Sequence, residues 1–208
     1  MQAPPPVRGA SLRGLLALAA VLQLLMAPPG YGASLYKLYR LHISQRGDSY
    51  SMRADVHLDA TPAEVYAVLV DFKHWTKINP SVRKSRVLKT LGFGTTLVYT
   101  QTRMCAVFFC HTLRQVQEIT ELGPRDIVAV TLPGQSNVKQ GSSFWHLEPQ
   151  DAGTRLIWDA TITPRFWIPP LIGPRIIQDE LRRQCQNTLA GIEHRVRERR
   201  LAAPDSAP

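Results

Sequence analysis

The feature that most constrains the fold of this chain is a long amphipathic helix pattern close to its C-terminal end. Between Arg175 and Arg200, apolar or small residues recur at helical spacing and form one stripe: Ile177, Leu181, Cys185, Thr188, Ile192 and Val196. A helix of this length is roughly 39 Å long at 1.5 Å per residue, which is enough to cross a small domain. We therefore expect the rest of the chain to build a surface that covers this stripe.

The chain before this helix alternates polar and apolar residues with the period of two that is typical of strands. Two such segments, from Tyr36 to Ile43 and from Met52 to Leu58, flank a Gly-Asp turn and predict a hairpin. Six more follow around residues 82–88, 97–103, 108–117, 127–132, 143–148 and 156–163. Turns rich in glycine and proline give them short links, which predicts an antiparallel meander rather than a parallel sheet.

A helix start signal stands between the hairpin and the meander. Thr61, Pro62 and Glu64 have the arrangement of a capping box with proline at the first helical position. Apolar residues then follow at helical spacing, and we expect a short helix that ends near Asp71 to Trp75.

The first 33 residues have the composition of a targeting segment. Arg8 and Arg13 precede an uncharged, mostly apolar run of 13 residues from Gly14 to Met26, and small residues follow at positions 30, 32 and 33. A membrane span needs about 20 apolar residues, so this run is short for one. We expect residues 1–33 to be a signal peptide, with an uncleaved anchor as the alternative, and the protein to be exported and periplasmic or secreted.

The remaining chain reads as one domain over residues 34–200, followed by a disordered tail over residues 201–208. Its composition, 44% apolar and 20% charged, is that of a globular protein and excludes collagen-like and disulfide-dense classes. No internal repeat or low-complexity linker divides it.

Several motifs resemble those of the START-like helix-grip superfamily. They are residues 60–72 (ATPAEVYAVLVDF) with Trp75 and Asn79-Pro80, residues 144–149 (FWHLEP), residues 153–156 (GTRL) and the proline-rich segment before the last helix. Within that superfamily the chain is most similar to the polyketide cyclase/dehydrase and lipid-transport group, which includes coenzyme-Q-binding proteins. The resemblance implies an α+β helix-grip fold, in which a curved antiparallel sheet wraps around the long C-terminal helix and two short helices lie near the N-terminus.

Such a fold implies a cavity between sheet and helix. Alternation places Leu97, Tyr99, Trp145, Leu147, Leu156, Trp158 and Ala160 on the concave side of the sheet. From these we expect Tyr99, Trp145 and Trp158 to bind a ligand, with Ile177 and Leu181 of the last helix opposite them. The alternative is that these residues fill a solid core, because periodicity alone does not distinguish a filled interior from a hollow one.

An apolar segment around two adjacent prolines precedes the last helix. Its residues Phe166, Trp167 and Ile168 could form a lid over the cavity or a foot that touches a membrane, or could tuck against the neighbouring helix. Arg165 and Arg175 flank the segment and favour a transient contact with an anionic membrane surface.

Three functions remain open on these grounds. We expect an exported, non-catalytic protein that binds or carries a lipid-like apolar molecule, such as a lipid, a quinone or a polyketide-like compound. The alternatives are a cyclase or dehydratase that uses Tyr99, Gln101 or Asp159 as an acid or base, and an interaction module without a ligand. The six histidines show no metal-ligand spacing and no nucleophile motif is present, so we expect no catalytic residues, no metal and no cofactor.

The three cysteines suggest one disulfide. Cys105 and Cys110 flank four residues that fit the tip of a hairpin, and an exported protein meets oxidising conditions. We expect these two to be bonded, with two reduced strand cysteines as the alternative, and Cys185 to stay reduced and inert.

The basic charge, +9 with a pI of about 9.9, favours anionic partners without identifying one. Six arginines, at positions 182, 183, 195, 197, 199 and 200, lie on the last helix, where we expect a solvated face or one turned to anionic lipid. We expect no nucleic-acid partner, because the protein is expected to be exported and its sequence has no recognised nucleic-acid-binding motif. We expect a monomer.

Overall fold

The computed structural model describes residues 36–106, 109–166, 168 and 173–202. Its elements are β1 (Tyr36–Arg46), β2 (Ser49–Leu58), α2 (Pro62–Leu69), the 3-10 helix η1 (Phe72–His74), α3 (Trp75–Ile78), β3 (Val82–Gly92), β4 (Thr95–Ala106), β5 (Phe109–Glu121), β6 (Asp126–Thr131), the 3-10 helix η2 (Pro133–Gln135), β7 (Val138–Gln150), β8 (Gly153–Pro164) and α4 (Gly173–Ala202). The signal peptide expected over residues 1–33 lies outside the described residues, as does the tail after residue 202. Residues 201 and 202 belong to α4, which is slightly longer at both ends than the sequence predicts.

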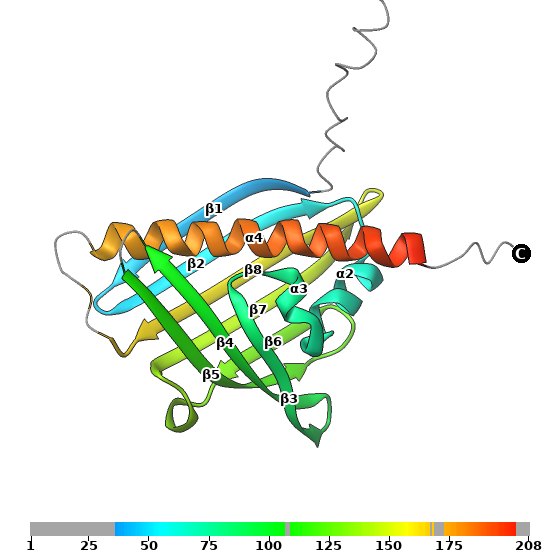
Figure 1. Cartoon of the computed structure of the whole chain (residues 1–208). Coiled ribbons are helices and arrows are strands. Elements are labelled where there is room, and N and C mark those ends of the chain that lie inside the picture. Colours follow the sequence, from blue (N-terminus) through cyan, green and yellow to red (C-terminus); the bar gives the residue numbers. More distant parts are fainter. Residues whose placement is uncertain (1–35, 107–108, 167, 169–172, 203–208) are drawn as a thin grey trace, which may run out of the picture. The chain divides into compact units, whose positions relative to one another are not determined.

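All eight strands form one antiparallel sheet in the order β1-β2-β8-β7-β6-β5-β4-β3. The N-terminal hairpin joins the meander because β2 pairs with β8, with Ala54 opposite Trp158. The sheet curves around α4, which crosses its concave side (Figure 1). The expected helix-grip fold is therefore confirmed, and most strands run further than their apolar alternation indicates, whereas β6 has the expected length.

The two short helices lie between β2 and β3. The capping box of α2 is formed as the sequence predicts: the Glu64 amide donates to Thr61 Oγ1 over 3.3 Å, and the Thr61 amide donates to Glu64 Oε2 over 2.8 Å. The eight-residue α2 is followed by η1 and by α3, a helix of four residues. The second short helix is thus a single turn.

The C-terminal half of α4 packs into the apolar core. Leu189 and Ile192 are fully buried, and Val196 is 1% exposed. All three belong to one apolar cluster with Val56 of β2 and Leu156 of β8. Complete burial of a Leu or Ile side chain contributes about 1.5 to 3 kcal/mol, so this half of the helix holds the domain together. Among the described residues, no helix has both the length and the apolarity to cross a membrane.

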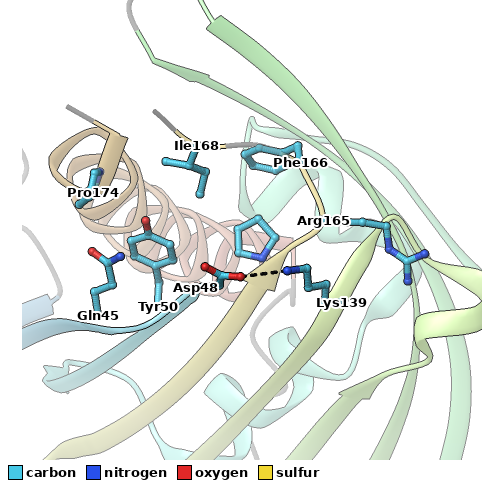
Figure 2. A pocket seen from close by; sticks show the side chains of 9 residues that line it. Gln45, Asp48, Tyr50, Lys139, Arg165, Phe166, Ile168 and Pro174 are labelled. Atoms are coloured by element: carbon cyan, nitrogen blue, oxygen red, sulfur yellow. Dashed lines mark hydrogen bonds and ion pairs between the residues drawn. The ribbon is translucent and has the colours of Figure 1, made fainter. Parts of the chain in front are cut away.

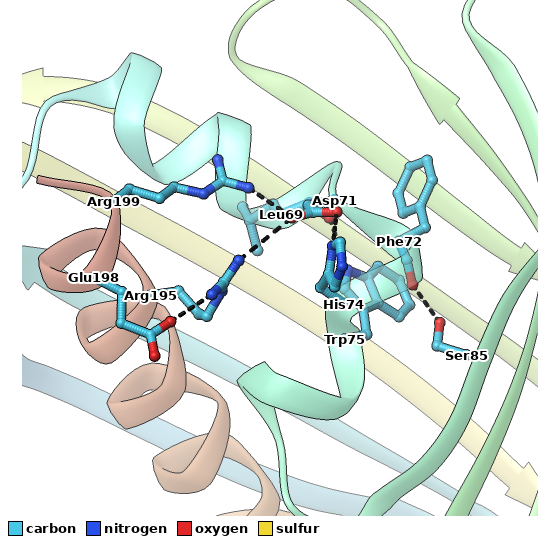
Figure 3. A network of polar contacts seen from close by, with 9 residues as sticks. All are labelled: Leu69, Asp71, Phe72, His74, Trp75, Ser85, Arg195, Glu198 and Arg199. Carbon is cyan, nitrogen blue, oxygen red and sulfur yellow. Dashed lines mark hydrogen bonds and ion pairs between the residues drawn. The ribbon is translucent and has the colours of Figure 1, made fainter. Parts of the chain in front are cut away.

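The arginines at the end of α4 are not a free basic face, which corrects the interpretation of the sequence. Arg199 Nη2 lies 2.6 Å from Asp71 Oδ2, and Arg195 Nη2 lies 3.7 Å from the same oxygen (Figure 3). Arg200 Nε lies 2.6 Å from Glu64 Oε1. Glu64 of α2 and Asp71, which lies just after α2, therefore form ion pairs with three of these arginines and tie the last turns of α4 to the short helices.

Asp71 is the centre of this contact. His74 Nδ1 lies 2.6 Å from its Oδ1 on the side away from α4 (Figure 3). Burial raises the pKa of Asp71, but the hydrogen bonds from His74 and Arg199 outweigh it and hold that pKa below its ordinary value. The carboxylate is thus ionised at neutral pH and anchors both partners.

Candidate functional site

A small hollow of about 140 Å³ lies on the concave side of the sheet, and we call it the tryptophan hollow. Three indoles line it: Trp145 from β7, Trp158 from β8 and Trp75 from α3. The rings of Trp145 and Trp158 stack with centroids 6.0 Å apart, and Trp75 lies tilted 6.4 Å from Trp145. The remaining lining residues are Leu69, Ile78, Asn79, Val82 and Thr188. Trp145 and Trp158 thus share a hollow, as the alternation of β7 and β8 predicts.

The three indole N–H groups of the hollow differ in their hydrogen bonds. Trp75 Nε1 donates to the Leu69 carbonyl over 2.9 Å, and Trp158 Nε1 donates to Ser143 Oγ over 2.8 Å. Trp145 Nε1 is buried and has no hydrogen-bond partner among the described residues. A buried donor without a partner costs about 1 to 3 kcal/mol, and this atom has less than 1 Å² of accessible surface, so it belongs to the packed core and not to the open space of the hollow.

A polar network closes the side of the hollow between α3 and α4. Asn79 Nδ2 donates to Gln184 Oε1 over 2.8 Å and to Thr188 Oγ1 over 3.0 Å, while its Oδ1 accepts from the Ser81 amide over 2.9 Å. Gln184 in turn donates to Glu180 Oε1 over 2.6 Å. Asn79 therefore has its donors and its carbonyl engaged within the protein and holds α3 against α4.

A larger hollow of about 520 Å³ lies at the start of α4 (Figure 2), and we call it the Tyr50 hollow. Its lining mixes charged and apolar groups: Gln45, Asp48, Tyr50, Lys139, Pro164, Arg165, Phe166, Ile168 and Pro174. Lys139 Nζ and Asp48 Oδ2 form an ion pair of 2.9 Å across it (Figure 2). Burial raises the pKa of the Tyr50 phenol, so this side chain is neutral at physiological pH.

The expected lid segment borders the Tyr50 hollow. Phe166 stacks on His111 of β5 with a centroid distance of 4.1 Å and an interplanar angle of 6°. Arg165 Nη2 donates to the carbonyls of Pro133 and Val138 over 3.3 and 3.4 Å. Both side chains are thus held against the strands, while Trp167 lies outside the described residues.

Leu97 and Tyr99 do not face the cavity, contrary to the sequence prediction. Both lie on the opposite face of β4 from the fully buried Val98, and the Arg86 guanidinium lies 5.1 Å from the Tyr99 ring centroid. The inward positions of β4 include Thr96 and Thr100, both buried. The sequence prediction assigned the wrong face of β4 to the interior, because it expected the larger apolar residues to point inward. In the structure the threonines of this strand point inward instead.

In the first half of α4, the buried positions differ from the apolar stripe that the sequence predicts. Ile177 and Leu181 are half-buried and take no part in the tryptophan hollow, while Glu180 between them is only 4% exposed. Hydrogen bonds from Gln184 and Arg183 make burial of this carboxylate tolerable. Apolar spacing could not reveal an inward-facing charge.

The cysteines are arranged as expected. Cys105 and Cys110 are disulfide-bonded at the end of the β4–β5 hairpin, and Cys185 is free and buried in α4. Burial raises the pKa of the Cys185 thiol to about 12, which makes it unreactive. Arg183 Nη2 donates to the Cys105 carbonyl over 2.6 Å and so joins the hairpin to α4.

Sequence reasoning missed most of the residues that line the tryptophan hollow together with Trp145 and Trp158. Trp75 and Asn79 belong to the motif that carries the family resemblance, and that motif was the available signal for their importance. Thr188 lies on the predicted helix stripe but was not assigned to a site. Among the described residues, no group of three or more His, Cys, Asp or Glu side chains is arranged to hold a metal ion.

The comparisons with known proteins agree on the fold. The sequence model of the family described as "Polyketide cyclase / dehydrase and lipid transport" matches residues 49–197. The structure is similar to TTHA0849 from Thermus thermophilus, with a TM-score of 0.60 and 19% identity over 74% of this chain and 99% of that one. Among curated proteins, none matches this chain.

Two further solved structures have titles that name an activity. The Zhui aromatase/cyclase from Streptomyces sp. R1128 has a TM-score of 0.59 and 20% identity over 74% of this chain and 97% of that one. A STAR-related lipid transfer protein from Xanthomonas axonopodis has a TM-score of 0.60 and 17% identity over 78% of this chain and 99% of that one. At such identities the likeness shows the fold alone.

Proposed function

Since the chain belongs to the polyketide cyclase/dehydrase and lipid transport family, we propose that it binds and carries an apolar small molecule between the sheet and α4. The ligand classes that fit this proposal are a lipid, a quinone or a polyketide-like compound. The proposal includes export of the protein and transient contact with an anionic membrane surface, where such a ligand would be collected or delivered.

The observation that carries the proposal is the tryptophan hollow. In a solid core, Trp145 and Trp158 would be packed to the density of the surrounding cluster, without a space of about 140 Å³ beside them. Apolar hollows of about this size bind small apolar molecules in other proteins. The three indole faces offer a large apolar contact area to such a molecule.

The chemistry of the lining favours binding over catalysis. None of the eight residues that line the tryptophan hollow has a carboxylate, an imidazole or a thiol. A cyclase or dehydratase moves protons and needs a group that titrates near the working pH. The indoles, the Asn79 amide and the Thr188 hydroxyl do not titrate in that range, so they suit a carrier better than an acid–base enzyme.

Export is supported by the pattern of residues 1–33, in which a basic start, an apolar run and small residues follow one another. N-terminal sequencing of protein from the exported fraction should find a mature N-terminus between Tyr31 and Leu35. An intact Met1 in a membrane pellet would contradict cleavage and export.

The binding proposal has a direct test. Mass spectrometry of organic extracts of the purified protein should find a bound apolar compound, and addition of fatty acids, quinones or sterols should change tryptophan emission saturably. Val82→Phe places a ring in the tryptophan hollow and should abolish binding. Leu97→Phe adds the same ring to the outer face of β4 and should leave binding intact. Empty extracts together with no saturable binding of any compound would reject the carrier function.

A further inference from the structure

The turn between β3 and β4 holds an aromatic residue that neither packing nor backbone geometry favours. Phe93 is fully exposed and has a φ of 48°. Positive φ is uncommon outside glycine, and a bulky residue in this conformation is an outlier that needs an explanation. Among the described residues, the other non-glycine residue with positive φ is Asp151, and aspartate is one of the residue types that tolerate this conformation. Residue type therefore explains Asp151 but not Phe93.

The geometry of the turn favours a different residue at position 93. Gly92 pairs with Thr95, so Phe93 and Gly94 form a two-residue hairpin loop, and φ is positive at both, 48° and 71°. This pattern is that of a type I′ turn, in which Asn-Gly is strongly preferred. The loop has the preferred glycine at its second position but Phe in place of asparagine at the first. A strained residue from which local folding gains nothing points to a function.

Phe93 is the centre of an exposed apolar patch. Leu91, near the end of β3, is 44% exposed, and Leu122, in the β5–β6 loop, is 61% exposed. The two loops are joined, because the Glu121 amide donates to the Gly94 carbonyl over 2.9 Å. We call Leu91, Phe93 and Leu122 the tip patch. The end of the β3–β4 hairpin points away from α4 (Figure 1), so the patch is presented outward from the domain.

The hairpin that carries the tip patch is strongly basic. Residues 82–106 include five basic side chains and no acidic one. Four of the five are exposed on β3: Arg83, Lys84, Arg86 and Lys89. None of these four has an ion-pair partner among the described residues, in contrast to the arginines at the end of α4. An exposed apolar tip beside unpaired cations complements a surface that is apolar inside and anionic outside.

Cations on β3 also have a simpler role. β3 is an edge strand of the sheet, and lysines on an edge prevent pairing with another chain. Exposed apolar side chains at the end of the same edge do not serve that role, because they favour association. Protection of the edge therefore explains the charges but not the tip patch.

We propose that the tip patch inserts into the interface of a bilayer that contains anionic phospholipids, and that the cations of β3 bind the headgroups. This inference rests on the membrane contact in the proposed function and assigns that contact to the β3–β4 hairpin. The segment before α4, which the sequence favours for the contact, has Arg165 and Phe166 engaged with neighbouring strands.

Phe93→Asn tests the proposal, because it separates membrane binding from folding. Co-sedimentation with vesicles made of equal parts phosphatidylcholine and phosphatidylglycerol measures the partition coefficient. That coefficient should fall about tenfold or more in Phe93→Asn, because the variant has no aromatic ring to bury in the interface. The free energy of unfolding should stay the same or rise, because Asn-Gly suits the turn. A loss of stability without a loss of vesicle binding would show a structural role and overturn the proposal.

Two control variants remove similar groups from other parts of the surface. Leu201, near the end of α4, is 88% exposed, and Leu201→Asn should leave vesicle binding unchanged. Lys89→Gln should lower binding about fivefold, because a cation near an anionic surface contributes to attraction. Lys37 is exposed on β1, the opposite edge strand, and Lys37→Gln should have no such effect. Equal losses in the variants and their controls would contradict a localised contact.

The lipid composition tests the electrostatic part of the proposal on the unmutated protein. Vesicles of phosphatidylcholine alone should bind more weakly than the anionic vesicles. High salt should weaken binding to the anionic vesicles, because it screens the attraction between β3 and the headgroups. Equal binding to both vesicle types at every salt concentration would overturn the role of the cations.

The outcomes distinguish this inference from the proposed function. If the unmutated protein and Phe93→Asn bind vesicles equally, the inference is wrong, and saturable binding of an apolar ligand still supports the carrier function. If the unmutated protein binds no vesicles, the inference and the membrane contact are both wrong. If Phe93→Asn loses vesicle binding but the unmutated protein binds no apolar ligand, the inference stands and the carrier function is wrong.

Discussion

The two halves of α4 face the same sheet but differ in how they are held. After Cys185, the helix presents fully buried Leu189 and Ile192 to the core, and its last turns form ion pairs with α2 and the η1 junction. Before Cys185, Ile177 and Leu181 are only half-buried and the buried Glu180 carboxylate takes the inward position. The helix is thus anchored at its C-terminal end.

This difference suggests that the two halves of α4 have different roles in the helix-grip domain. The tightly packed half provides the stability that fixes the fold, since buried apolar area is the main favourable contribution to folding. The loosely packed half borders the Tyr50 hollow, which includes Pro174 at the start of α4. Regions with few buried apolar contacts open at lower free energy than the core, so ligand passage is expected near that end.

The sharpest test of this comparison uses the same substitution in both halves. Leu189→Ala should lower the free energy of unfolding by about 3 to 5 kcal/mol, because it leaves a cavity in a fully packed core. Leu181→Ala should cost about 1 kcal/mol, because Leu181 is half-buried. Urea denaturation of the two variants measures both values. Equal losses would show that the two halves contribute alike.

A close backbone contact in the anchored half gives the next largest effect. A Cβ atom on Gly191 would lie 1.6 Å from the Ile78 carbonyl oxygen, so α4 and α3 can meet only if this residue is glycine. Gly191→Ala should therefore cost about 3 kcal/mol by forcing the helices apart. In Gly134→Ala the new methyl group meets nothing within 4 Å, and this variant should be neutral or slightly stabilising. A small loss in Gly191→Ala would show that this end of α4 is free to shift.

The ion pair at the end of α4 should make the anchor sensitive to acid. Hydrogen bonding to Arg200, assisted by the Thr61 cap, lowers the pKa of Glu64 from 4.5 to about 2. A lowered carboxylate pKa gives stability that is complete above pH 4.5 and is lost as the pH falls towards 2. The shift corresponds to about 3 kcal/mol, which solvent screening at this partly exposed pair reduces to about 1 to 2 kcal/mol.

Unfolding curves between about pH 2 and pH 6 measure this contribution. The unmutated protein should lose stability through that interval more steeply than Glu64→Gln, which lacks the titrating group. If the two pH profiles run parallel, the Glu64–Arg200 pair does not contribute to the anchor.

The smallest effect is expected beside the loosely held half, at the disulfide between Cys105 and Cys110. Reduction opens a loop with a sequence separation of only 5, so the loss of unfolding free energy should be about 1 kcal/mol, at the low end for disulfides. Non-reducing peptide mapping should find these two cysteines joined. Cys185 should resist alkylation in the native protein, because its thiol is buried and its pKa is about 12. Alkylation of the other two without prior reduction would reject the bond.

Local patterns in the sequence were sufficient for the strands, α2 and α4 and for their order, whereas the second short helix was expected only from the family resemblance. The period of two, the capping box at Thr61 and the long helical stripe each depend on residues a few positions apart, and the elements they predict are present. Trp145 and Trp158 were placed correctly for the same reason, because alternation along β7 and β8 decides which face they occupy. These features are set by local backbone geometry and by the burial of apolar groups.

The details of the site depend on contacts between residues far apart in the chain, which no local pattern encodes. Tyr99 was assigned to the wrong face because the threonines of β4 point inward. Which face of a strand is buried depends on what packs against it in the folded protein. Thr188 meets Asn79 across 109 positions, and the glycine at 191 is required only because Ile78 approaches it. Sequence therefore determined the elements and the fold, whereas only tertiary packing decided where the interior stays hollow and which residues line that hollow.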